Sequence, residues 1–228
     1  MTPPPFSTII LGGTGQVGGA AVDELLAIPE CREVIMVTRK AVSPRERVRN
    51  VVLDTGAADF VARIKTLASE MIAKHNHVSA VSCVGIGKGT AQWSEDDLKR
   101  VEVGVVGAFA RGCRDGGIAN FCLLSAVGST ATSPFKYVRV MGMKEDAVRA
   151  VGFTRLAIFR PGIIIGNVHT PGWSALLGAF LPGGFGNIDQ QILGRAIAKE
   201  AAGQTVLGGR ATGETIYENA DMRKLAAE

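Results

Sequence analysis

The 228-residue sequence predicts a doubly wound α/β fold with a parallel central sheet, formed by a single domain. The first observation is the apolar run 6–11, which is followed at once by a glycine-rich turn and by a helical pattern that reaches Ile28. The second is the alternation of further short apolar runs, at 34–38, 49–53, 78–84, 121–125 and 154–159, with helix-like segments. This alternation is typical of a parallel sheet with helices on both faces. The third is a 46% hydrophobic content with only 20% charged residues, which is enough for a substantial core.

The glycine-rich turn, Gly12-Gly13-Thr14-Gly15, stands between the first predicted strand and the first predicted helix. Gly12 suits the sharp turn, Gly15 lets backbone approach a ligand, and Gly18 lets the helix pack closely on the strand. The helix that begins near Gln16 points free N–H groups and its positive dipole end toward bound phosphates. These features predict a dinucleotide site whose contacts are Gly12, Thr14, Gly15, Gln16 and Val17.

The end of the second predicted strand carries Arg39 and Lys40, about twenty residues beyond the glycines. An acidic residue at this place would bind the adenosine ribose diol of NAD, whereas cations suit the additional phosphate of NADP. The cofactor predicted here is therefore NADP(H), with further contacts from Arg45 and Arg47 in the loop that follows. The alternative is a solvated loop that happens to be basic.

Other residues follow the ends of the next two predicted strands. Asp54 ends the third strand, where it would either meet the adenine amino group or serve as a turn residue. Cys83, Val84 and Gly85 end the fourth strand. Because ligands of open α/β sheets bind at the carboxyl ends of strands, near the reversal of strand order, we expect these three residues to border the cofactor's ribose.

Three later motifs carry a family resemblance. They are Leu124-Ser125-Ala126-Val127-Gly128, Tyr137-Val138-Arg139-Val140, and Phe159-Arg160-Pro161-Gly162. With the early glycines, they resemble an atypical short-chain dehydrogenase/reductase, an NAD(P)-binding Rossmann protein, and more narrowly the branch that includes the Tat-interacting protein. The resemblance covers nearly the whole chain. It implies that Ser125 orients a substrate carbonyl, that Tyr137 supplies the proton, and that Pro161 turns the chain toward the nicotinamide.

One position departs from the family pattern. The resemblance implies a lysine four residues after the tyrosine, which holds the nicotinamide ribose and lowers the tyrosine pKa, but Met141 stands there. Lys144 shares the helix face of Tyr137, yet it lies about 10 Å further along the axis, too far to replace that lysine unaided. Two functions therefore stay open. One is a slow or narrow-specificity NADPH-dependent reductase, and the other is an NADPH-binding regulatory or protein-interaction module. A purely structural protein without nucleotide is the third alternative.

Composition sets the remaining expectations. The net charge of +4 is too small and scattered to indicate nucleic acid, and no apolar run is long enough to span a bilayer. Without a secretory signal pattern, we expect a cytoplasmic protein, with association to an organelle surface as the alternative. The four cysteines and the pair His75 and His77 lack metal-ligand spacing, which predicts reduced thiols and no metal. The expected partners are a small carbonyl substrate or another protein, and the expected state is a monomer or homodimer.

The C-terminal region completes the predicted domain. Residues 1–162 form the dinucleotide-binding core, and residues 163–228 form a small lid or substrate region. The apolar segment 163–186 would line a substrate pocket, form a dimer surface, rest on a membrane or pack as a buried lid. A helix over 188–202, a short last strand at 206–209 and a last helix capped by Asn219 follow.

Overall fold

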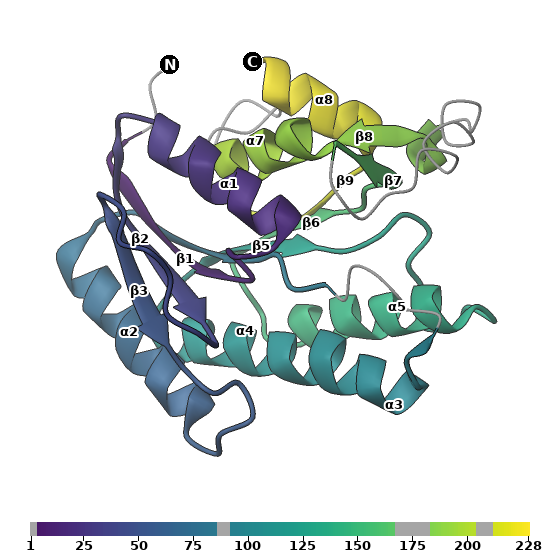
Figure 1. The fold of residues 1–228 in the computed structure, drawn as a ribbon, viewed down its shortest axis with the longest axis horizontal. Helices are drawn as coiled ribbons and strands as arrows, with labels where there is room; N and C mark the ends of the chain where they lie inside the picture. Colours follow the sequence, from purple (N-terminus) through teal and green to yellow (C-terminus); the bar gives the residue numbers. More distant parts are fainter. Residues whose placement is uncertain (1–3, 86–91, 167–182, 204–211) are drawn as a thin grey trace.

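A seven-stranded parallel sheet forms the centre of the structure, a computed structural model that describes residues 4–85, 92–166, 183–203 and 212–228. The strands lie in the order β3-β2-β1-β4-β5-β6-β9 (Figure 1). Their bounds are β1 Phe6–Leu11, β2 Cys31–Thr38, β3 Val48–Val52, β4 Val78–Ser82, β5 Asn120–Leu124, β6 Arg155–Phe159 and β9 Gly213–Tyr217. The chain starts in the middle of the sheet, builds one edge through β2 and β3, and returns to build the other from β4. This order confirms the predicted doubly wound fold and places the reversal between β1 and β4.

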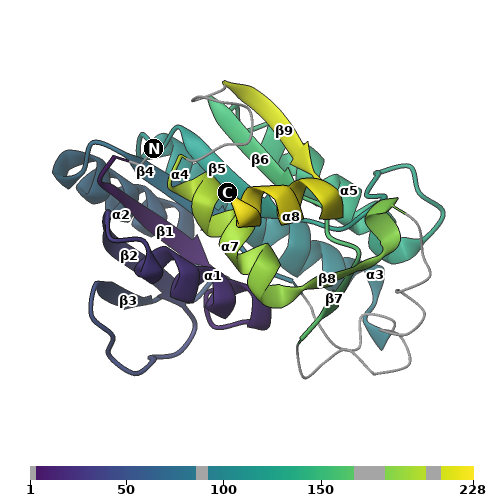
Figure 2. The same ribbon diagram turned by 90° about the horizontal axis from the view of Figure 1, so that it is seen from above.

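Helices cover both faces of the sheet (Figures 1 and 2). On one face lie α1 (Gln16–Ala27), α7 (Gln190–Ala201) and α8 (Asn219–Ala227), and on the other lie α2 (Phe60–Lys74), α4 (Val106–Asp115) and α5 (Lys136–Arg149). Successive strand side chains point to opposite faces. In β1, Phe6 and Ile10 therefore pack toward α1, while Ile9 and Leu11 pack toward α2 and α4.

The helical stretch before α4 is irregular. It begins with α3 (Glu95–Leu98), where the Ser94 hydroxyl accepts a hydrogen bond of 3.0 Å from the Asp97 backbone N–H. It continues as a π-helical segment, η2 (Lys99–Val105), which carries the fully buried Glu102. The acidic residues after Ser94 are typical of the first turn of a helix, but nothing in the sequence indicates the wider turn. Such π segments are rare and occur frequently at functional sites.

The C-terminal region differs in detail from the prediction. A small two-stranded sheet pairs β7 (Ile163–Ile165) with β8 (Asn187–Asp189), so α7 begins only at Gln190, and η3 (Gly183–Phe185) lies between these strands. The predicted strand at 206–209 and most of the apolar segment 163–186 lie outside the described residues. The seventh strand of the main sheet is β9, which the sequence does not predict.

Asn219 does not cap the last helix. Glu218 is the N-cap, and its side chain and that of Asp221 exchange hydrogen bonds with each other's backbone N–H groups. The buried Asn219 side chain instead accepts from the Gly162 N–H at 3.1 Å and donates to the Gly186 carbonyl at 2.7 Å. It thereby ties α8 to the chain that follows Pro161.

Two compositional expectations can be compared with the described residues. All four cysteines are buried and free, in agreement with the reduced thiols expected from their spacing. His75 lies 3.3 Å from a carboxylate oxygen of Glu33, and the described residues contain no cluster of three metal-ligating side chains. In the same part of the chain, no helix combines the length and apolar character that a membrane crossing needs.

Candidate functional site

A cleft of about 350 Å³ lies at the carboxyl ends of β1, β2 and β4, beside the point where strand order reverses. The glycine turn, the end of β2, the end of β4 and the irregular helix η2 line most of it, and Thr55 after β3 and Trp93 before α3 complete the lining. The lining residues used below are Gly12, Thr14, Gly15, Thr38, Arg39, Thr55, Cys83, Val84, Gly85, Val101 and Val105. The fold thus brings together candidate residues from three separate motifs, as ligand binding at a switch point requires.

The glycine turn has the geometry of a phosphate cradle. Gly12 has a φ of +85°, and a Cβ there would lie 2.7 Å from the Cys83 carbonyl carbon. A Cβ on Gly18 would lie 2.1 Å from the Gly12 carbonyl oxygen, to which the Gly15 N–H donates at 3.0 Å. These contacts require small residues at both positions. Gly15 is the N-cap of α1, whose first N–H groups face the turn.

Gln16 and Val17 begin helix α1 and contribute in different ways. Gln16 is exposed, whereas the Val17 side chain is buried in the core between α1 and the sheet. Val17 can therefore meet a phosphate through its backbone N–H but not through its side chain. The bare backbone and the start of a twelve-residue helix together fit a pyrophosphate group.

The end of β2 presents a positive charge to the cleft. The Thr38 hydroxyl donates to the Lys40 carbonyl at 2.7 Å and accepts from the Asn50 amide at 2.7 Å, which fixes the turn. Arg39 and Lys40 are exposed, and only Arg39 is among the cleft-lining residues. With respect to the described part of the chain, neither side chain forms an ion pair.

The basic loop after Lys40 does not supply the further contacts that the sequence suggests. Arg45 pairs with Asp23 on α1 at 2.7 Å. Arg47, with a φ of 59°, donates to the carbonyl of Leu26 near the end of α1 and to that of Cys31 at the start of β2. Both arginines are held by the helix rather than directed at the cleft, because the loop folds back over α1.

Asp54 is a turn residue in this structure. It is exposed, and its carboxylate accepts from the Gly56 N–H at 2.9 Å, while its neighbour Thr55 lines the cleft. Cys83, at the end of β4, is buried against the cleft, and its N–H donates to the Leu11 carbonyl at 2.9 Å. Burial raises the pKa of the Cys83 thiol to about 12, so this thiol stays protonated at neutral pH.

Ser125 is engaged inside the protein. It is 4% exposed, and its hydroxyl donates to a carboxylate oxygen of the fully buried Glu145 at 2.5 Å. Glu145 also accepts from Arg160 at 2.9 Å and from Arg149 at 3.0 Å. The family resemblance implies that the Ser125 hydroxyl binds a substrate carbonyl. In this structure the hydroxyl donates its hydrogen bond to the buried carboxylate of Glu145 instead. The more exposed neighbour, Ala126, has no hydroxyl.

Tyr137 stands near the start of α5 and is 36% exposed. Loss of solvent around its phenol, and then the negative charge of Glu102, raise the pKa of Tyr137 above its ordinary value of 10.0. The hydroxyl therefore keeps its proton at neutral pH. Met141, one turn later, is 2% exposed and packs in the core without a polar partner to offer.

Lys144 reaches the cleft wall, which axial spacing along the helix did not indicate. It is fully buried, and its ammonium lies 2.8 Å from a carboxylate oxygen of Glu102 and 3.4 Å from the carbonyl oxygen of the cleft-lining Val84. Helical side chains point back toward the start of the helix, so the charge lies well behind the Cα position. Pro161, which follows β6, is buried outside the cleft lining, and its carbonyl accepts from the Val127 N–H at 3.0 Å.

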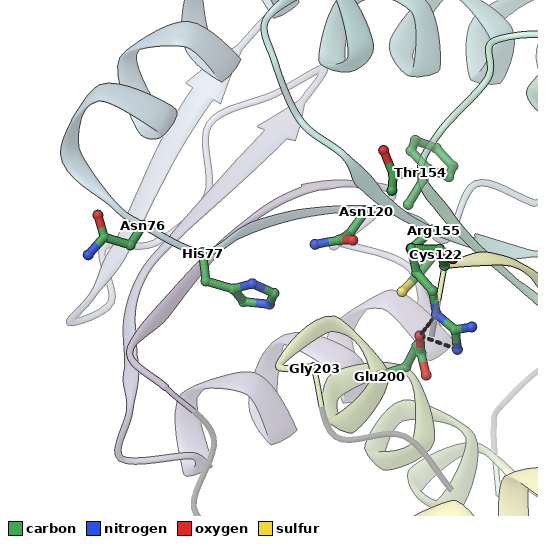
Figure 3. A pocket seen from close by; sticks show the side chains of 10 residues that line it. Asn76, His77, Asn120, Cys122, Thr154, Arg155, Glu200 and Gly203 are labelled. Atoms are coloured by element: carbon green, nitrogen blue, oxygen red, sulfur yellow. Dashed lines mark hydrogen bonds and ion pairs between the residues drawn. The ribbon is translucent and has the colours of Figure 1, made fainter. Parts of the chain in front are cut away.

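A second cavity, of about 290 Å³, lies at the amino ends of the strands, where β4, β5 and β6 begin (Figure 3). It contains the ion pair of Arg155 with Glu200, whose atoms lie 2.8 Å apart. The Tyr217 hydroxyl donates to Glu200 at 2.7 Å and accepts from Arg155 at 3.0 Å. This network satisfies its own charges, and none of the candidate site residues lines the cavity.

Comparison with known proteins places this chain in a family. No family model matches it. Among curated proteins, it is 34% identical over 159 residues to the mitochondrial protein fmp52 of Aspergillus clavatus, an alignment that covers 69% of this chain and 66% of the relative. It is 30% identical over 162 residues to the mitochondrial protein fmp52-1 of Aspergillus oryzae, which covers 71% of this chain and 67% of the relative. The chain belongs to the Fmp52 family. It spans about two thirds of the length of these Fmp52 relatives.

Membership in the Fmp52 family corrects one expectation. The relatives are named as mitochondrial proteins, so the cytoplasmic location expected from the sequence is wrong. The reason is that composition and the lack of a secretory pattern distinguish secreted chains from others, and they carry no information on the organelle.

A solved structure supports the fold. The short-chain dehydrogenase of Leptospira borgpetersenii with bound NAD+ superposes with a TM-score of 0.68 at 14% identity, covering 97% of this chain and 94% of that one. The Rossmann-like α/β fold expected from the motifs is thereby confirmed. The comparisons do not confirm the Tat-interacting branch.

Proposed function

We propose that this Fmp52-family chain binds NADP(H) in the cleft at the carboxyl ends of β1, β2 and β4. One observation carries the proposal: the glycine turn, with its bare backbone at the start of α1, and Arg39 line the same cavity. The turn suits the pyrophosphate, and Arg39 suits an additional phosphate on the adenosine ribose.

The charge of the cleft favours the phosphorylated cofactor. None of the described residues that line the cleft is acidic, so the ribose diol of NAD has no carboxylate to bind there. Arg39 offers a planar fork of donors that matches phosphate oxygens, and the exposed Lys40 adds a second positive charge beside it. Thr38 holds this turn through its two hydrogen bonds.

Reduction of a small carbonyl compound is the first candidate activity. The cofactor would supply the hydride and Tyr137 would donate the proton, but the raised pKa makes this phenol a weaker acid than a lysine-assisted tyrosine, so turnover would be slow. Ser125 contributes indirectly in this scheme, since its hydroxyl is bound to Glu145 and fixes the chain after β5. Tyr137 therefore acts without the serine and lysine that the family resemblance implies.

The second candidate is a cofactor-bound regulatory or protein-interaction module. It is favoured by Met141, which supplies no charge beside Tyr137, and by the engagement of Ser125 within the core. In this function, bound cofactor would stabilise the surface around the cleft without turnover. Replacement of Met141 by lysine discriminates the two candidates, because it raises carbonyl reduction only if the remaining site is competent.

The cofactor proposal is tested by titrating the purified protein with NADPH and NADH, by calorimetry or cofactor fluorescence. The Arg39→Ala/Lys40→Ala variant should bind NADPH about 10- to 100-fold more weakly and NADH almost unchanged, because only NADPH carries the additional phosphate. Arg45→Ala is the matched control, since Arg45 lies in the same basic loop but pairs with Asp23. Equal NADPH affinity in the double variant would contradict the assignment of Arg39. The names of the relatives make mitochondria the location to test, by fractionation of cells that express the full chain.

A further inference from the structure

The buried ion pair of Lys144 with Glu102 has no part in the proposed function so far. Both side chains are fully buried, and the charged atoms lie 2.8 Å apart between α5 and η2. Removing two charges from water is costly, and a buried ion pair often stabilises a fold no better than apolar side chains of the same size. Its place in the molecule therefore matters more than its contribution to stability.

The pair belongs to the wall of the cleft. The Lys144 ammonium lies 3.4 Å from the carbonyl oxygen of Val84, and Glu102 lies on η2 between Val101 and Val105. All three valines line the cleft. The π-helical segment places Glu102 opposite α5, so this irregularity is what brings the two charges together at the wall.

The charges of the pair act on groups beside the cleft. The positive charge of Lys144 partly offsets the burial that raises the pKa of the Cys83 thiol. The negative charge of Glu102 adds to the loss of solvent that raises the pKa of Tyr137. Arg39 marks the adenosine side of the cleft at β2, so the end of β4 and η2 form the side left for the nicotinamide.

We propose that the Lys144–Glu102 ion pair balances the charge of the cleft wall, so that this wall favours neither the oxidised nor the reduced cofactor. The nicotinamide ring carries a positive charge only in the oxidised form, while the phosphates and the adenosine are the same in both. A charge in the adjacent wall therefore changes the relative affinity of the two forms and leaves their shared contacts alone. In the native protein the effects of the two paired charges on the nicotinamide oppose each other. Met141 adds no charge on this side of the cleft. This inference rests on the proposed function.

The test measures dissociation constants for NADP+ and NADPH, and the ratio of the two, in variants of this pair. Lys144→Met removes the positive member of the pair, so the carboxylate of Glu102 should shift the ratio about tenfold in favour of NADP+. Glu102→Gln leaves an unopposed ammonium and should shift it by a similar factor in favour of NADPH. Lys144→Arg, which keeps the charge, and the double variant Lys144→Met/Glu102→Gln, which removes both charges, should stay close to the native ratio.

Glu200→Gln is the matched control, because it breaks the buried ion pair of Glu200 with Arg155, which lies at the amino ends of the strands. It should lower the unfolding temperature and leave the cofactor ratio unchanged. Thermal unfolding of every variant confirms that each is folded when it is titrated, and the double variant provides a folded reference if a single variant does not fold.

The outcomes separate the two proposals. If native protein binds neither NADP+ nor NADPH, the cofactor proposal fails, and this inference fails with it. If native protein binds both but the single variants Lys144→Met and Glu102→Gln keep the native ratio, or shift it in the same direction, the cofactor proposal stands and the role of the ion pair is refuted.

Discussion

Replacement of Gly18 by alanine tests whether the close approach of α1 to the glycine turn is essential. A Cβ at this position would lie 2.1 Å from the Gly12 carbonyl oxygen, 2.8 Å from the Gly12 carbonyl carbon and 3.0 Å from the Gly13 Cα. A comfortable contact needs about 3.5 Å, so the helix or the turn must move by more than about 1 Å. The opposing atoms are all backbone, and no side-chain rotation relieves the overlap. We expect a loss of about 3 kcal/mol in the free energy of unfolding, at the upper end of overpacking costs.

Gly19, the next residue of the same helix, provides the control. A Cβ there meets only the Gly13 carbonyl oxygen, at 3.8 Å, which is an ordinary contact. Gly19→Ala should therefore stabilise the fold by about 0.5–1 kcal/mol, since alanine is the better helix residue. Urea denaturation gives both free energies, and an NADPH titration should show weakened binding for Gly18→Ala alone. Equal stability and equal NADPH affinity in the two variants would refute the argument that the turn needs Gly18.

The remaining predictions concern single features of the fold. Arg47→Ala should lower the free energy of unfolding by about 1–2 kcal/mol, because the carbonyls of Leu26 on α1 and Cys31 on β2 lose their donor; urea denaturation measures this, and an unchanged value would contradict the role of these hydrogen bonds. Ser125→Ala should cost about 2 kcal/mol by the same assay and leave the NADPH dissociation constant unchanged, because Glu145 keeps its arginine partners; a lost affinity at native stability would instead assign Ser125 to the cofactor. Stability should decline above about pH 10, because the raised pKa values of Tyr137 and Tyr217 make the folded chain hold these protons more tightly than the unfolded chain; denaturation at a series of alkaline pH values would show no decline if both phenols were freely solvated. All four cysteines should react slowly with a thiol reagent near neutral pH and rapidly in denaturant, and fast native labelling would show that the packing around them is open.

The order of strands and helices was predictable from the sequence because both faces of a parallel sheet are buried, which leaves each strand as a short apolar run. The edge strand β9 was missed for the same reason. Four of its five residues are exposed or half-buried, and its sequence, Gly-Glu-Thr-Ile-Tyr, has no apolar run. β9 is a strand because it forms backbone hydrogen bonds with β6, and the local sequence pattern does not indicate this pairing.

The candidate site was predictable where backbone position decides the outcome. The glycine turn and the ends of β2 and β4 line one cleft, because strand order alone brings these segments together. Side-chain partners across long sequence separations could not be predicted. Ser125 binds a carboxylate twenty residues away on α5, and Lys144 binds Glu102 on a π-helical segment. Helical spacing locates the Cα atoms of such residues and not the charged ends of their side chains.

The contact between α1 and α7 has a consequence for the growing chain during translation. Gly194 lets α7 approach α1 so closely that a Cβ there would lie 2.8 Å from Ala20, and Arg195 pairs with Glu24 at 2.9 Å. The opposite face of the sheet is covered by helices that end at Arg149. While residues 190–227 are still in the ribosome, the apolar side chains of β1 that face α7 have only α1 over them. The nascent chain therefore has one face of its sheet covered by helices and the other only partly covered. During this interval the exposed apolar side chains are most accessible to aggregation or to chaperone binding.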